Sequence, residues 1–181
     1  MNIITLPDPL LRQVCEPVEM GDKSIKKLAK QMAKLMYKTD GVGIAAPQVG
    51  ILKRFVVVDC TWVEEDENGK SLGKKPLIMI NPEIVEHSEE RVTNSEGCLS
   101  VPGVSGDVER WSLVKVECYN ENYEKVSYEG DGLFGRCMQH ELDHLDGKTF
   151  VDRMNPMERI QIMQEYAAAQ QAGARPGETS K

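Results

Sequence analysis

Two histidines stand four residues apart in the pattern His140-Glu141-x-x-His144. On a helix, positions i and i+4 lie on one face, one turn apart, so these two imidazoles can bind one metal ion. The glutamate between them lies close enough to act on a water at that metal. The pattern therefore predicts a hydrolytic metal site. Short patterns of this kind also occur by chance on exposed helices, so a third protein ligand is needed to decide.

The residues around the two histidines are typical of a buried helix. Asp131 can serve as the N-cap, and Gly147 stands where the glycine that follows a helix belongs. A single stripe at positions i, i+4, i+7, i+8 and i+11 is expected to face the core, which would place the metal inside the molecule. Its members are Leu133, Cys137, His140, Glu141 and His144.

Length and composition favour one globular domain. The chain has 181 residues, of which 40% are hydrophobic and 28% charged, as is ordinary for such a domain. The net charge of −7 argues against a general nucleic-acid binder. No apolar run approaches the ~20 residues that span a membrane, and no signal peptide is evident. An odd count of five cysteines then favours reduced thiols in the cytoplasm.

The periodicity of apolar residues predicts an α+β fold. Small antiparallel sheets are expected around the central metal-binding helix, with one helix in the N-terminal half and one at the C-terminus. Asn155 and Pro156 mark the start of the C-terminal helix. The Asn81-Pro82 pair is expected to stop one strand. The predicted helices are 22–39, the metal helix and the one that begins at 155, and the predicted strands are 54–59, 77–80, 84–92, 113–119 and 123–128.

Two further stretches do not fit a helix or a strand. Small residues fill positions 41–50, where glycines let a backbone approach another group closely and Gln48 is the only polar side chain. This loop is either the wall of a ligand site or a packed turn. Cys98 lies between a glycine and a turn-rich stretch, so it either faces a site or is an inert core thiol.

Taken together, these stretches resemble the peptide deformylase family. Their order and spacing match the family, and the resemblance extends from about residue 3 to about residue 153. It implies a single deformylase-like catalytic domain over 1–170, and we expect a disordered tail over 171–181. The three matching blocks read GVGIAAPQ at 41–48, EGCLS at 96–100 and QHELDH at 139–144.

The resemblance supplies the third ligand. It implies that Cys98, His140 and His144 hold one divalent metal ion, with a water in the fourth position. Three protein ligands and an open position are typical of catalytic metal centres. The family implies Fe²⁺, with Zn²⁺ or Ni²⁺ as substitutes, and the ligand types alone do not choose among them. Zinc proteases with the same histidine pattern usually take a further histidine or glutamate, so Cys98 distinguishes this chain from them.

The implied reaction is hydrolysis of the N-formyl group from the initiator methionine of nascent polypeptides. Glu141 is expected to take a proton from the attacking water and deliver it to the leaving amine. The Gln48 side-chain amide and the Leu99 backbone N–H are expected to stabilise the oxyanion.

The substrate contacts follow from the same resemblance. Gly43 should lie beside the substrate backbone. The methionine pocket is expected to comprise Ile44, Leu133, Cys137 and the ring of His140. We hypothesise that Glu96 pairs with Arg110 and holds the Cys98 loop. Asp143 is expected to form a structural salt bridge.

The resemblance also bears on partners. The N-formylmethionyl nascent peptide is the expected partner of a monomer, with no direct nucleic-acid specificity and no membrane. A basic C-terminal helix docks some family members on the ribosome. Only a weak ribosome contact is expected here, since acidic residues offset Arg159, Arg175 and Lys181.

Two other readings stay open at this point. One is a metallopeptidase or another amidase, against which Cys98 and Gln48 speak. The other is a non-catalytic binding module with a structural metal, which a fourth protein ligand would favour.

Overall fold

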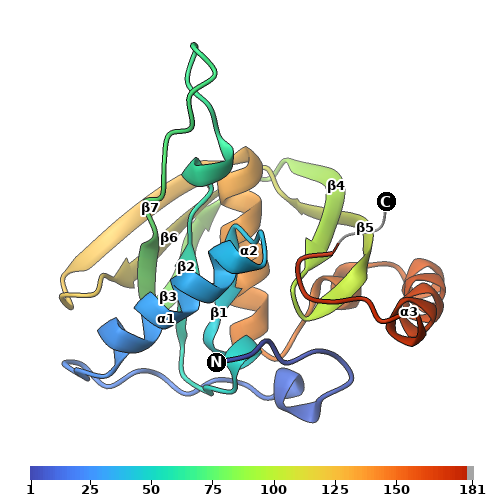
Figure 1. The fold of residues 1–181 in the computed structure, drawn as a ribbon. Coiled ribbons are helices and arrows are strands. Elements are labelled where there is room, and N and C mark those ends of the chain that lie inside the picture. The colour runs from blue at the N-terminus through green and yellow to red at the C-terminus, as the bar shows by residue number, and fades with distance from the viewer. Residues whose placement is uncertain (179–181) are drawn as a thin grey trace.

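The computed structural model describes residues 1–178, and in it a buried helix, α2, lies between two antiparallel sheets (Figure 1). Helix α1 covers the outer face of the larger sheet, and α3 lies at the far edge beside the smaller one. The predicted α+β class is confirmed. The helices are α1 (Ile25–Lys38), α2 (Gly132–Leu145) and α3 (Pro156–Gln171), and the strands are β1 (Gly43–Ala45), β2 (Phe55–Val58), β3 (Leu77–His87), β4 (Arg91–Cys98), β5 (Val101–Trp111), β6 (Leu113–Tyr119) and β7 (Lys125–Asp131).

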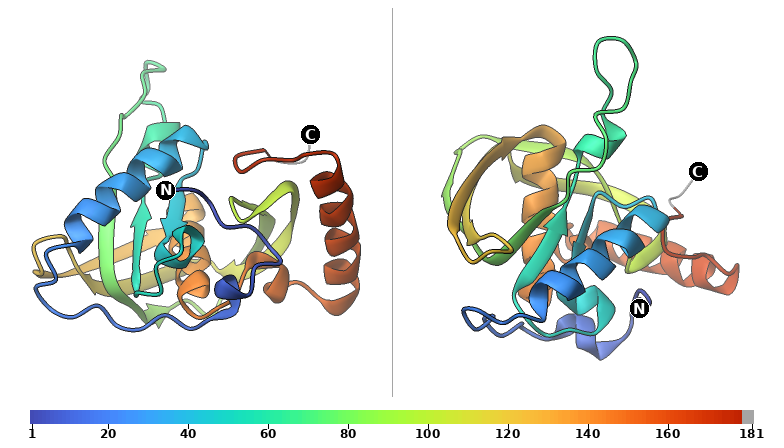
Figure 2. Two further views of the ribbon diagram at one scale, coloured as in Figure 1. Left: turned by 60° about the horizontal axis from the view of Figure 1, so that its bottom comes forward. Right: turned by 60° about the vertical axis from the view of Figure 1, so that its left-hand side comes forward.

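The larger sheet separates α1 from α2. Its strand order is β1-β2-β3-β6-β7, and every pair is antiparallel. Because side chains alternate along a strand, β2 supplies both faces of the sheet. Val56 and Val58 belong to the cluster that contains α2, whereas Phe55 and Val57 belong to the cluster that contains α1. Figure 2 shows the sheet curling around α2.

Helix α2 is enclosed along most of its length. All residues from 137 to 145 are buried, as expected for a helix covered on several sides. Gly147 follows the helix with a positive φ of 70°, as predicted for the glycine after its end. Asp131 occupies the N-cap position, but its side chain caps no backbone N–H.

The smaller sheet lies on the side of α2 opposite the larger sheet. It contains β4 and β5 alone, which pack with α3, the N-terminal segment and the short 3₁₀ helix Phe150–Arg153 in a third apolar cluster. Tyr166 of α3 donates a hydrogen bond of 2.6 Å to the carbonyl of Leu6, which joins α3 to the N-terminal segment. As predicted, Asn155 caps α3, accepting from the backbone N–H groups of Met157 and Glu158.

The prediction that Asn81-Pro82 ends a strand is wrong. Strand β3 continues to His87 and pairs with β2 over residues 77–80 and with β6 over residues 80–87. Ile80 thus has a partner on each side, and a register shift in the β6 pairing follows it. Asn81 adopts a φ of 50°, a left-handed conformation that asparagine tolerates better than most residues. Its side chain is hydrogen-bonded to the backbone N–H and carbonyl of Val18 at 2.8 and 2.9 Å. The pair therefore forms an irregularity within the strand.

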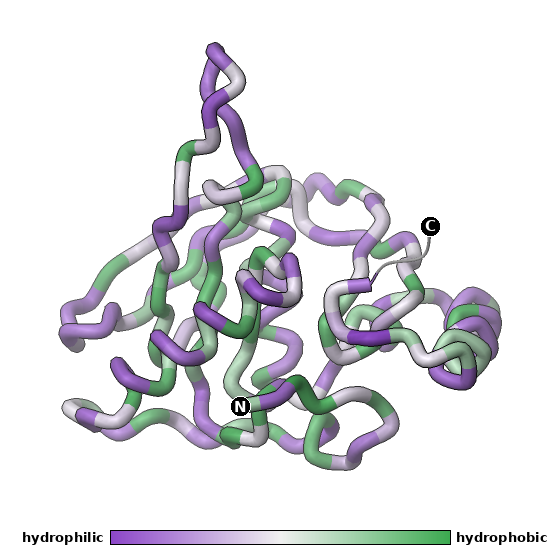
Figure 3. Tube along the Cα trace, viewed as in Figure 1, coloured by the Kyte–Doolittle hydropathy of each residue, from purple (hydrophilic) through white to green (hydrophobic). Residues whose placement is uncertain are grey.

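Hydrophilic residues gather away from this core. The segment between the 3₁₀ helix Thr61–Val63 and β3 projects from the body and is mostly hydrophilic along its length (Figure 3). Within the part of the chain that the structure describes, the helices are all too short or too polar to cross a membrane.

Candidate metal centre

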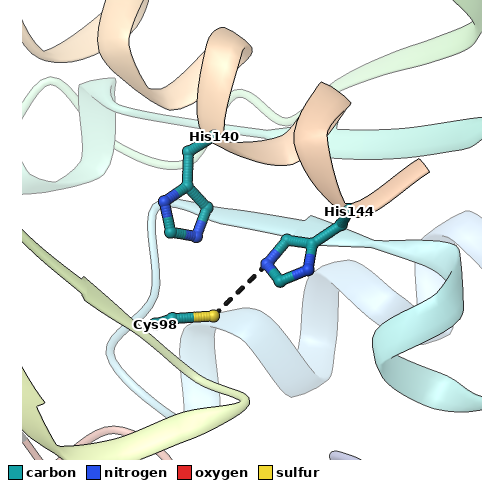
Figure 4. Close-up of side chains that lie close together, drawn as sticks. All are labelled: Cys98, His140 and His144. Atoms are coloured by element: carbon teal, nitrogen blue, oxygen red, sulfur yellow. Dashed lines mark hydrogen bonds between the residues drawn. The ribbon is translucent and has the colours of Figure 1, made fainter. Parts of the chain in front are cut away.

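Helix α2 directs two imidazoles toward the end of strand β4. The His140 and His144 rings are 5.1 Å apart between centroids, one helical turn from each other, and both side chains are buried. Cys98 is the last residue of β4, and its Sγ lies 3.2 Å from His144 Nε2. The three ligand atoms all lie within 4.8 Å of one another. Figure 4 shows the thiol and both rings converging on one point.

The irregular end of the β4–β5 pair orients the thiol. A register shift separates Gly97 from Cys98, so the cysteine pairs with Val101 in a tight reversal. The Ser100 backbone N–H donates to Cys98 Sγ at 3.4 Å, and Gln48 Nε2 lies 3.6 Å from the same sulfur. These two donors hold the sulfur in place, pointing toward the histidines of α2.

Glu96 orients His140. Its Oε2 lies 2.9 Å from His140 Nδ1, so the ring donates there and leaves Nε2 facing the site. Arg110 grips the same carboxylate with two hydrogen bonds of 2.9 Å each. Burial alone would raise the pKa of Glu96, but hydrogen bonds from Arg110 and His140 hold that pKa well below its usual value. The expected Glu96–Arg110 pair is thus formed, and the carboxylate stays charged beside the histidine.

Two arginines that the sequence analysis missed complete this network. Arg136 contacts Glu96 Oε1 at 2.7 Å and also donates to the carbonyls of Val92 and Val108. It thereby ties α2 to both strands of the smaller sheet. Arg153 and Arg110 both pair with Asp143, which has the structural role expected of it. Arg136 precedes His140 by four residues, so its place on the same helix face was a signal available in the sequence.

Glu141 is a buried carboxyl group with one unsatisfied oxygen. Its side chain is 4% exposed, and burial raises its pKa to about 7. Among the described residues, Glu141 Oε2 and His144 Nδ1 are the only buried side-chain nitrogen or oxygen atoms without a hydrogen-bond partner. Unpaired buried polar atoms are costly and rare in folded proteins. Their presence here indicates a site built for something besides the protein's own hydrogen bonds.

The donor set fits a divalent metal ion. One thiol and two imidazoles match the three-ligand plan of catalytic centres. Burial lowers the pKa of His144 well below its ordinary value, so its ring is neutral, as a metal ligand must be. Within residues 1–178, this is the only cluster of histidine, cysteine and acidic side chains that could hold a metal ion.

Gln48 lies beside the centre, in the short 3₁₀ helix Ala46–Val49. Its Oε1 accepts a hydrogen bond of 2.8 Å from the Ala45 backbone N–H. This contact fixes the orientation of the amide, so Nε2 points toward Ser100 Oγ, at 3.1 Å, and toward the Cys98 sulfur. A donor is therefore held next to the predicted ligands by a buried hydrogen bond.

A cavity of about 230 Å³ opens beside the centre. Its wall includes most of the residues predicted to touch substrate. Ile44 is absent from that wall, because its buried side chain packs in the cluster under α1. Leu133 lines the cavity but is 46% exposed, so it lies at the rim and not in the core as its place in the stripe suggested. The predicted residues on the wall are Gly43, Gln48, Glu96, Cys98, Leu99, Leu133, Cys137, His140 and Glu141.

Strand β1 presents backbone groups to this cavity. It is an edge strand, and Val42 accepts a hydrogen bond from the Asp59 N–H on the β2 side. Because facing groups alternate along an antiparallel pair, the N–H and C=O of Gly43 point away from β2. A Cβ at Gly43 would lie 2.4 Å from Glu141 Oε1 and 2.7 Å from Cys137 Sγ. Only glycine therefore fits between β1 and α2 at this position.

Comparisons with known proteins agree on one family. The family model described as polypeptide deformylase matches residues 1–160. A peptide deformylase of Rhizobium meliloti is 41% identical over 174 residues, which cover 96% of each chain. One from Neisseria meningitidis is 45% identical over 90% of this chain and 91% of its own. A crystal structure of a peptide deformylase from Synechococcus elongatus in complex with actinonin has a TM-score of 0.82 and 39% identity, covering 95% of this chain and 90% of that one.

Proposed function

Because the chain belongs to the polypeptide deformylase family, we propose that the centre on α2 removes the formyl group from the N-terminus of nascent polypeptides. The protein is a hydrolase, and its substrate is a linear N-formyl amide. The observation that carries the assignment of the site is the convergence of Cys98, His140 and His144 beside a carboxyl oxygen of Glu141 that has no partner.

We propose that Cys98, His140 and His144 hold the metal. A divalent ion there would polarise the formyl carbonyl and make a water more acidic, to a pKa of about 7. Glu96 would keep the His140 ring in the orientation that binding needs, through its 2.9 Å contact with Nδ1.

Glu141 is the proposed proton carrier. Its unpartnered Oε2 would accept a proton from the attacking water and then deliver it to the methionine nitrogen as the C–N bond breaks. The products are formate and a free amine. A pKa of about 7 suits a group that must both take and give a proton near neutral pH.

Gln48 and Leu99 are the proposed oxyanion donors. Gln48 Nε2 is already fixed beside the centre by the contact between Oε1 and the Ala45 N–H. Leu99 lies in the tight reversal between Cys98 and Val101. It also lines the cavity, so its backbone N–H is close to the proposed metal site. Loss of one such donor typically costs ~3–4 kcal/mol of transition-state stabilisation.

The substrate would extend from this cavity along β1. The outward N–H and C=O groups of Gly43 can pair with a peptide backbone, as an added strand does at a sheet edge. Cys137 and Leu133 would contact the methionine side chain from α2. Ile44 would not contact the substrate, since its side chain is buried under α1 and the same alternation turns its backbone groups toward β2.

The remaining features are proposed on chemical grounds. A mixed thiolate and imidazole set suits Fe²⁺, with Zn²⁺ or Ni²⁺ as substitutes. We propose a monomeric enzyme, with its catalytic domain over residues 1–170, that works in the cytoplasm, where its nascent substrates arise. Any ribosome contact by the C-terminal region would be weak, because Glu158 and Glu165 offset the charge of Arg159.

The deciding experiment measures formate release from a formyl-Met-Ala-Ser peptide by protein prepared without oxygen. We expect Glu141→Gln to lower kcat by about 10²–10⁴-fold, because the proton carrier is lost. Metal analysis should show one ion per chain in both proteins, and an acetyl-Met-Ala-Ser peptide should remain uncut. If the unmodified protein binds metal but releases no formate, the activity proposed here is wrong.

A further inference from the structure

The C-terminal residues 174–178 cross the mouth of the catalytic cavity. We call them the C-terminal strap. The chain leaves α3, runs back past β5 and ends its described course near the end of α1 (Figures 1 and 2). Gly177 and Glu178 line the same cavity as Gln48, Cys98 and Glu141. The strap is therefore part of the wall that a substrate meets.

Two local signals shape the strap. Helix α3 ends in a Schellman motif, in which the Gly173 N–H bonds to Gln170 and the Ala174 N–H to Ala169. A tight turn follows, closed by a 3.0 Å bond from the Glu178 N–H to the Arg175 carbonyl. Proline at its second position and Gly177, with a φ of 93°, at its third are the residues that a type II turn prefers. The Arg175 N–H also donates to the Glu178 carboxylate at 2.8 Å.

The strap touches both walls of the cavity. On the β5 side, the Gly103 N–H donates a 2.8 Å hydrogen bond to the Glu178 carbonyl. A Cβ at Gly103 would lie 2.8 Å from the methyl groups of both Ala169 and Ala174, so a glycine is needed beneath the strap. On the α1 side, a Cβ at Gly177 would lie 2.5 Å from the Thr39 carbonyl oxygen. The two walls are thus bridged over the cavity.

The bridged cavity is small for a peptide site. Sites for drug-sized ligands usually enclose ~300–1,000 Å³, whereas this one measures about 230 Å³. Such a volume suits a formylmethionyl end with little beyond it. We expect a longer chain that follows the edge of β1 to meet Gly177 and Glu178, which line the cavity.

We propose that the C-terminal strap determines how peptide length affects substrate binding. This inference rests on the deformylase function proposed above. A short formylated peptide binds beneath the strap, whereas a longer one displaces it from Gly103 and Thr39. Displacement adds its cost to binding, so the strap raises KM for long peptides and leaves kcat unchanged. The apparent Kd for a long peptide is its intrinsic Kd divided by the fraction of molecules in which the strap is displaced.

The test compares formyl-Met-Ala amide with a formylated hexapeptide. One variant ends at Ala172, which removes the strap and keeps all of α3. Another is Gly177→Val, whose side chain would collide with the Thr39 carbonyl. Gly21→Val is the matched control, because Gly21 has a similar φ of 85° but nothing within 4 Å of its Cβ position.

In both strap variants, we expect KM for the hexapeptide to fall about tenfold, as for a mouth that is closed nine-tenths of the time. KM for the dipeptide should fall far less than KM for the hexapeptide, and all constants of Gly21→Val should match the unmodified enzyme. Unchanged or higher hexapeptide KM values in the strap variants would overturn the proposal. Failure of the unmodified enzyme to release formate from either peptide would instead contradict the deformylase function.

A second measurement does not depend on turnover. Hydrogen exchange followed by mass spectrometry should show faster exchange at the Gly103 amide in the chain that ends at Ala172. Saturation with an unformylated hexapeptide should speed exchange in the strap of the unmodified enzyme, and an unformylated dipeptide should not. Equal exchange under all these conditions would mean that the strap does not cover the mouth.

Discussion

The position and the pKa of the Glu141 carboxyl group are set by the residues packed around it. Gly43 on β1 leaves room for its carboxyl group, and the closed environment raises its pKa to about 7. Glu96, in contrast, is held charged by Arg110 and His140 although it too is buried. The pKa values of two carboxyl groups in one site are thus shifted in opposite directions. Such a division is typical of sites that need one proton carrier and one fixed anion.

Gly43→Ala should therefore damage catalysis. The new Cβ would lie 2.4 Å from Glu141 Oε1 and 2.7 Å from Cys137 Sγ, so the catalytic carboxyl must move. Misplacement of about 1 Å costs on the order of 10²-fold in rate, and we expect at least that loss in kcat/KM for formate release. Gly41→Ala is the matched control, since its Cβ would press on the flexible tip of Leu99 at 3.1 Å and would meet Met36 Cγ and the Gly43 carbonyl oxygen at ordinary contact distances of 3.4 and 3.5 Å. Equal activity of the two variants would contradict this account.

Glu96→Gln should weaken both folding and metal binding. It would leave the buried Arg110 without one of its two acidic partners, and breaking a buried pair typically costs about 3–5 kcal/mol. Loss of the carboxylate behind His140 should also weaken metal affinity by about 10–100-fold. Urea unfolding and a competitive chelator titration measure the two effects.

Glu109→Gln provides the comparison for that variant. Its pair with Arg91 is exposed and 3.6 Å long, so we expect a change below about 1 kcal/mol in unfolding free energy and no change in metal affinity. If Glu96→Gln behaved in the same way, the carboxylate would not have the orienting role assigned to it.

Strand β3 shows how an element tolerates an interruption. Its pairing with β6 shifts register just after Ile80, and Asn81 lies at this shift with a left-handed backbone and two hydrogen bonds to Val18. The Asn81 N–H also donates to the Arg54 carbonyl at 2.8 Å. The irregularity thus fastens the N-terminal segment and the loop before β2 to the sheet that carries β1.

Asn81→Ala should destabilise the protein without changing the centre. It removes two hydrogen bonds, worth about 0.5–1.5 kcal/mol each, and leaves a residue that tolerates positive φ poorly, at about 1–2 kcal/mol. We expect the unfolding free energy to fall by about 2–5 kcal/mol, with kcat unchanged below the melting temperature. Asn94→Ala, on exposed β4, should change stability little. Similar stabilities for the two variants would show that the Val18 contacts contribute nothing.

The molecule as a whole is joined at its centre by side chains from separate layers. Cys98 comes from the smaller sheet, His140 and His144 from α2, and Gln48 from the segment after the edge strand β1 of the larger sheet. Arg136 and Glu96 add a polar link between α2 and the smaller sheet. A metal held by the three proposed ligands would cross-link the same two layers.

Removal of the metal should therefore lower the melting temperature of the whole domain. A ligand present at about 1,000 times its Kd stabilises the folded state by about 4 kcal/mol. We expect a chelator to remove that stabilisation and readdition of Fe²⁺ or Zn²⁺ to restore it, as followed by calorimetry. Cys98→Ser should melt at one temperature with or without chelator. If the chelator left the melting temperature of the unmodified protein unchanged, the proposed cross-link would be wrong.

Much of the site can be predicted from the sequence because it depends on local periodicity. The spacing of His140 and His144 places two rings on one helix face, and Asn155 and Gly147 mark helix ends through their own backbone preferences. The family resemblance added Cys98 to the ligand set. The helix face and the helix ends depend on neighbours within a few residues, so the linear sequence contains what is needed to predict them.

Contacts between distant segments were decided only by the tertiary structure. Arg136 and Arg153 meet Glu96 and Asp143 through the packing of α2 against the smaller sheet. Ile44 turns away from the cavity because the alternation along β1 assigns it to the α1 side. The tail predicted as disordered over 171–181 lies against Gly103 and Thr39 up to residue 178, and residues 179–181 lie outside the described part. The spacing of Arg136 and His140 places them on one helix face, but no period or motif predicts which distant residues a side chain will meet, since those contacts form only when the elements pack.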